Sequence, residues 1–135
     1  MDGKVKIAAL ALLFMLGAMR SLSWAAEGDQ GRVYFLRYCG SCHGVDGKGS
    51  GTVSRSLAVK PADLTQLQKN NKGVFPAEKV MATIEGKTRV EAHGESKMPV
   101  WGEVFAREAT AQKDPIAAST AKIKAIAEYL ATIQR

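Results

Sequence analysis

The chain has 135 residues, enough for one domain, and carries a formal net charge of +6 at pH 7. Its cations form no dense run and do not alternate with aromatic residues, so nothing indicates a nucleic-acid-binding protein. The sequence contains only 2 cysteines, which excludes a scaffold held by several disulfides.

Residues 1–25 predict a cleaved secretory signal peptide. Lys4 and Lys6 form a basic start, residues 7–19 are apolar, and Ala25 closes a small-residue cleavage site. A spanning helix needs about 20 apolar residues, so an uncleaved membrane anchor is the weaker alternative. We therefore expect export to the periplasm and one mature domain, residues 26–135. Cleavage removes three cations and one acid, which lowers the net charge from +6 to +4.

Residues 31–42 predict a helix, because apolar side chains recur in it at helical spacing. Gly31 inside this helix costs up to ~1 kcal/mol relative to alanine. We expect the close approach of another helix to account for the glycine.

Cys39, Cys42 and His43 have the spacing of a c-type haem attachment site. Residues i and i+3 share one side of a helical turn, so both thiols can add to the vinyl groups of one porphyrin. His43 follows at once and is a candidate iron ligand. Three alternatives are a thioredoxin-like dithiol, which expects a βαβ setting, a structural disulfide, and half of a zinc site. The motif favours one covalently bound haem c with its iron.

The rest of the chain predicts short helices joined by loops. Residues 44–51 contain four glycines and read as a loop, and Pro61 breaks any helix around it. We expect Pro76 to open a helix that Gly86 ends. A short helix is expected over Trp101–Arg107.

The last helix is expected to begin at Asp114-Pro115, a cap followed by a proline at the first position. Its lysines are expected on the face opposite an apolar stripe. The stripe consists of Ile116, Ile123, Ile126, Leu130 and Ile133. No strand-period run is present in the sequence, so the predicted class is all-α: a small fold of three to five helices around one haem.

The sixth iron position has three candidate ligands: His93, Met81 and Met98. Met81 belongs to a helical apolar stripe, where a methionine is usually part of the core. Met98 precedes Pro99, which favours an extended backbone, and its thioether would raise the reduction potential relative to a second histidine. His93 lies in the same irregular stretch, so side-chain chemistry alone leaves His93 and Met98 as close rivals.

Four segments together resemble the class I c-type cytochromes, over nearly all of the mature chain. The resemblance implies that Met98 is the distal ligand and that a carbonyl near Pro61 accepts the second N–H of His43. It also implies that an aromatic side chain of the last helix packs near Gly31. The charged stretch of residues 87–97, which includes His93, departs from the family pattern and leaves the role of His93 open. The matching segments are Gly31-x-x-x-Phe35-x-x-x-Cys39-x-x-Cys42-His43-Gly44, Pro61-x-x-Leu64, Met98-Pro99-x-Trp101 and Ile126-Ala-Glu-Tyr129-Leu130.

The resemblance implies a monohaem one-electron carrier rather than an enzyme, with His43 and Met98 as axial ligands. With both axial positions filled we expect no small-molecule substrate. Because electron transfer needs fast release, we expect transient docking to protein redox partners, with a membrane-bound redox complex as a candidate partner. The alternatives are a haem-bearing electron-transfer subunit of a dehydrogenase or oxidase complex, and an enzyme or gas sensor in which Met98 dissociates from the iron.

Overall fold

The computed structural model describes residues 29–88 and 98–135, and every regular element in these ranges is helical. The predicted all-α class is therefore confirmed. The predicted signal peptide and His93 lie outside the described residues. In chain order, the elements are a helix over residues 29–38, α2 (Gly40–His43), η1 (Ser54–Ser56), η2 (Leu64–Gln66), α3 (Leu67–Asn70), α4 (Ala77–Glu85), α5 (Trp101–Glu108) and α6 (Pro115–Thr132).

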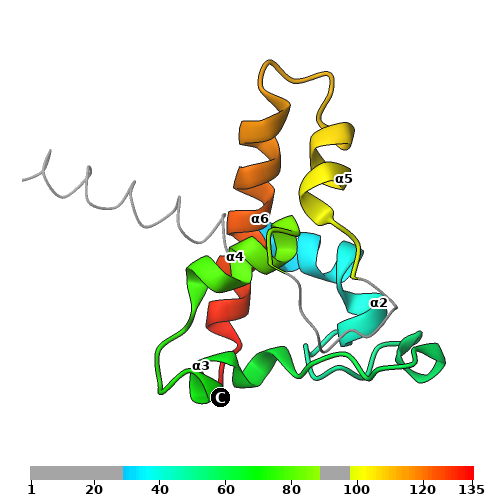
Figure 1. Cartoon of the computed structure of the whole chain (residues 1–135), viewed down its shortest axis with the longest axis vertical. Helices are drawn as coiled ribbons and strands as arrows, with labels where there is room; N and C mark the ends of the chain where they lie inside the picture. The colour runs from blue at the N-terminus through cyan, green and yellow to red at the C-terminus, as the bar shows by residue number, and fades with distance from the viewer. Residues whose placement is uncertain (1–28, 89–97) are drawn as a thin grey trace, which may run out of the picture.

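The long helix α6 organises the core. Figure 1 shows α5 alongside the upper half of α6 and α4 crossing near its middle, and both helices contact α6. Ile123, Ile126 and Leu130 are buried there, as the predicted stripe requires. Ile116 is 68 % exposed, so its assignment to the stripe was wrong. The buried positions of α6 begin only at Ser119, so the first turn lies beyond the core.

The ends of the helices follow local sequence signals. The Asp114 carboxylate accepts a hydrogen bond from the Ala117 N–H at 3.0 Å, and Pro115 occupies the first turn of α6, as predicted. Gly86 ends α4 in the left-handed conformation with φ 91°. Pro76 precedes α4 instead of occupying its first position, because its ψ of 65° is not helical. Among the described helices, none is both long and apolar enough to cross a bilayer.

The first helix packs tightly against α6 at Gly31. A Cβ atom at this position would overlap the Ala125 carbonyl oxygen and lie 3.0 Å from the Tyr129 Cβ. Beside it, the rings of Phe35 and Tyr129 lie 5.3 Å apart between centroids. The expected close approach of another helix, with an aromatic residue of the last helix beside Gly31, is confirmed.

Candidate functional site

The Cys39–His43 motif forms a single helical turn. The N–H groups of Cys42 and His43 both donate to the Cys39 carbonyl, at 3.2 Å and 2.9 Å. Cys39 and His43 are buried, Cys42 is half-buried, and the two cysteines are not joined in a disulfide. These backbone bonds fix the turn. They therefore hold the side chains of Cys39, Cys42 and His43 close to one another.

The glycine-rich loop is hydrogen-bonded to this turn. The Gly49 N–H donates to the His43 carbonyl at 2.7 Å, and the Gly51 N–H donates to the Cys42 carbonyl at 3.1 Å. Gly49 has φ +77°, and a Cβ there would overlap the Pro61 carbonyl oxygen. The loop therefore satisfies the carbonyls at the end of α2, and its glycine allows the chain around Pro61 to approach closely.

The orientation of the His43 imidazole is set by a backbone carbonyl that is remote in the sequence. Its Nδ1 lies 3.0 Å from the Ala62 oxygen. A carbonyl can only accept, so Nδ1 carries the proton in this hydrogen bond, and Nε2 is the nitrogen through which such a histidine would bind iron. The expected acceptor near Pro61 is thus the carbonyl of the next residue, Ala62.

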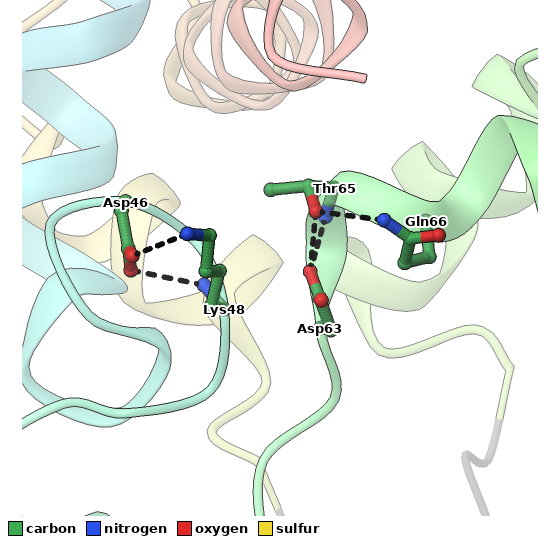
Figure 2. A network of polar contacts seen from close by, with 5 residues as sticks. All are labelled: Asp46, Lys48, Asp63, Thr65 and Gln66. Carbon is green, nitrogen blue, oxygen red and sulfur yellow. Dashed lines mark hydrogen bonds and ion pairs between the residues drawn. The ribbon is translucent and has the colours of Figure 1, made fainter. Parts of the chain in front are cut away.

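A polar network holds the segment that carries the Ala62 carbonyl (Figure 2). The Asp63 carboxylate accepts from the Thr65 hydroxyl at 2.6 Å and from the Thr65 N–H at 2.9 Å, which caps η2. The hydroxyl bond is the main cause that keeps the pKa of Asp63 below its ordinary value. Across from it, the Lys48 N–H donates to Asp46, and the Leu64 N–H donates to the Gly47 carbonyl at 2.7 Å.

The C-terminus closes over the same segment. The Gln134 amide donates to the Leu64 carbonyl at 2.9 Å, and the Arg135 N–H donates to the Thr65 carbonyl at 2.9 Å. Sequence analysis did not identify these supporting residues. The Asp63-x-Thr65 spacing is a local capping signal that could have revealed the first part of the network, whereas nothing in the sequence connects Gln134 to Leu64.

An apolar cavity of about 290 Å³ lies beside the motif. Cys39, His43 and Met98 all line it. A second cavity of about 200 Å³ shares these three residues and adds Cys42 and Trp101. The structure therefore brings all four predicted site residues around one space, while Met81 is half-buried and packs against the core. The remaining residues of the larger cavity are Ala62, Leu64, Leu67, Asn70, Asn71, Pro76, Lys79, Val80, Thr83, Ile84, Ile126 and Leu130.

This donor set fits a c-type haem better than the alternatives. Two thiols, an imidazole and a thioether border mostly apolar walls, which suit the faces of a porphyrin. Burial, with a further contribution from Cys42, raises the pKa of Cys39 to about 12, whereas a redox-active dithiol needs a lowered thiol pKa. Within residues 29–88 and 98–135, no group of three His, Cys, Asp or Glu side chains could hold a metal ion.

A half-buried cation supports the wall near Tyr38. Lys122 Nζ lies 2.8 Å from a Glu108 carboxylate oxygen and 4.6 Å from the centroid of the Phe105 ring. The Tyr38 hydroxyl donates to the same oxygen of Glu108 at 2.8 Å. Burial alone would lower the pKa of Lys122, but its bonds to Glu108 and Tyr38 raise it above the ordinary value. This lysine of α6 therefore does not lie on the expected exposed face.

The comparisons with known proteins identify a family for the chain. The family model described as cytochrome c matches residues 28–134, which is most of the chain. No curated protein and no solved structure matches the chain.

Proposed function

Because the chain belongs to the cytochrome c family, we propose that it is a periplasmic monohaem electron carrier with haem c bound through Cys39 and Cys42. The axial ligands in this proposal are His43 and Met98. The supporting observation is that Cys39, His43 and Met98 line one apolar cavity, although Met98 is far from the motif in the sequence.

The chain's own residues would bind and orient the group. The Ala62 carbonyl, 3.0 Å from His43 Nδ1, orients the imidazole and would leave Nε2 as the nitrogen that holds the iron. The thioether of Met98 is a soft ligand that favours the reduced iron. The apolar walls, among them Ile126 and Leu130, would exclude water. They would thereby favour the reduced iron, which is the less charged state.

The bound haem supplies reversible Fe(III)/Fe(II) one-electron chemistry. The chain would hold both axial positions in each oxidation state, so no substrate needs to reach the metal. In this proposal the partners are other redox proteins, which dock transiently and are then released, as small and weakly bound interfaces allow.

Removing the thiols tests the proposal. Two thiols match two vinyl groups, so we expect Cys39→Ala or Cys42→Ala to reduce covalent haem and the double variant to retain none. Proteins matured in the periplasm would be extracted with acid and organic solvent, and the haem remaining on the polypeptide measured by absorption.

Ser41→Ala is the matched control, because Ser41 is an exposed residue inside the same motif. It should keep the haem content of the wild type. Haem that resists extraction in the double cysteine variant, or a wild-type protein without covalent haem, would refute the proposed attachment.

A further inference from the structure

The walls of the larger cavity divide into an apolar part and a polar part. The side shared with the smaller cavity carries Cys39, His43 and Met98, and the smaller cavity is lined further by Cys42, Pro61 and Trp101. The other side is bordered by the end of α3 and the first half of α4, where Asn70 and Lys79 lie. In Figure 1, α2 lies to the right, whereas α3 and the beginning of α4 lie to the left. Asn70 and Lys79 line the larger cavity from these elements, whereas Cys42 lines only the smaller cavity.

The charge on this polar side has one sign. Lys79 is the cation among the described residues that line the larger cavity, and no acidic residue is among them. The ion pairs found within residues 29–88 and 98–135 do not include Lys79. Two polar neighbours have bonds of their own, since Asn71 donates to the Val74 carbonyl and Thr83 to the Lys79 carbonyl, both at 2.8 Å.

A haem carries groups that match this division. Its two vinyl groups occupy one edge of the macrocycle, and its two carboxylates occupy the opposite edge. If the thiols hold the vinyl edge, the opposite edge with its carboxylates faces the cavity wall that α3 and α4 form. A carboxylate taken partly out of water needs a charged or hydrogen-bonding partner.

We propose that Lys79 is the counter-ion of a haem carboxylate and that Asn70 donates a hydrogen bond at the same edge. This inference rests on the proposed function and assigns the binding of the carboxylate class to this lysine. The exposed position of Lys79 in the first turn of α4 lets its long side chain reach over the cavity mouth while the ammonium stays partly hydrated. The haem would then be held covalently at one edge and by charge at the other.

Zero-length coupling of the haem-loaded protein tests the assignment. A water-soluble carbodiimide joins a carboxylate to a neighbouring ammonium as an amide, with loss of one water. We expect the peptide containing Lys79 to become linked to the haem peptide, and mass spectrometry of a digest would identify the product. Lys79→Gln should lose the product. Lys69→Gln should keep it, because Lys69 is an exposed residue of α3 that does not line the cavity.

The reduction potential gives a second measurement on the same variants. A cation near the haem favours Fe(II), so Lys79→Gln should have a lower potential than the wild type, while Lys69→Gln stays close to it and Lys79→Arg recovers most of the loss. Covalent haem without a Lys79 product, or equal potentials for the two glutamine variants, would overturn this inference alone. A wild-type protein without covalent haem would instead overturn the proposed function on which the inference rests.

Discussion

Gly31→Ala tests whether the contact between the first helix and α6 requires a residue without a side chain. The added Cβ would overlap the Ala125 carbonyl oxygen, lie 2.9 Å from the carbon of that carbonyl, and lie 3.0 Å from the Tyr129 Cβ. Ordinary van der Waals contact begins at about 3.4 Å, so relieving the overlap with the Ala125 oxygen would require the two helices to separate by on the order of one ångström. Two of these atoms belong to the backbone and cannot move aside as a flexible side chain would.

Three free-energy terms give the size of the effect. Alanine stabilises a helix by up to ~1 kcal/mol relative to glycine. Overpacking costs about 1–3 kcal/mol. Separation of the helices also weakens the Phe35–Tyr129 ring pair, 5.3 Å apart, and such pairs contribute about 0.5–1.5 kcal/mol. We expect a net destabilisation of about 1–3 kcal/mol, which lowers the Tm of a domain of this size by about 4–12 °C.

Thermal unfolding of the haem-loaded protein, followed by circular dichroism, measures this change. Gly40→Ala is the matched control, because a Cβ there would lie 3.8 Å from its nearest neighbour, the Phe35 carbonyl oxygen. It should leave the Tm unchanged or raise it slightly. A Gly31→Ala protein that is as stable as the wild type would refute the reasoning from close helix approach.

Two further predictions concern the distal ligand and the response to acid. Met98→His should keep a low-spin haem but lower its reduction potential by a sizeable part of the roughly 0.8 V that axial ligands span. Redox titration measures this, and the control Met81→Leu should leave the potential unchanged. An unchanged potential in Met98→His would exclude Met98 as the ligand. The bond from Lys122 holds the pKa of Glu108 below its ordinary value, so its stabilising contribution is present above the unfolded pKa and is lost as the pH falls through the lower folded pKa. Glu108→Gln should therefore cost at most about 1 kcal/mol near neutral pH and weaken the dependence of stability on pH below about 4.5. Denaturant unfolding at a series of pH values measures this. If the pair did not form, the free energy of unfolding would change with pH equally in both proteins.

The parts of the fold that depend on neighbouring residues could be predicted from the sequence. Cys39, Cys42 and His43 share a turn because of their spacing, and Asp114-Pro115 begins α6 because a cap and a fixed φ act within one turn. Gly31 also carried a usable signal, since a glycine in a helix is unfavourable unless something requires it. The Ile116 assignment failed because helical periodicity gives the direction of a side chain but not where along the helix the packing partners end.

The tertiary structure alone decided which remote groups complete the site. Ala62 contributes only a backbone carbonyl to His43, and every residue has one, so no side-chain pattern marks it. Gln134 reaches Leu64, and Lys122 enters a cluster with Glu108 and Tyr38, through contacts between segments that are distant in the sequence. Lys79 looks like any lysine of an exposed helix until the fold places it at the mouth of a cavity that Cys39 lines as well. Local spacing therefore determined the Cys39–His43 turn. The remote residues that surround this turn depend on how the helices pack around α6.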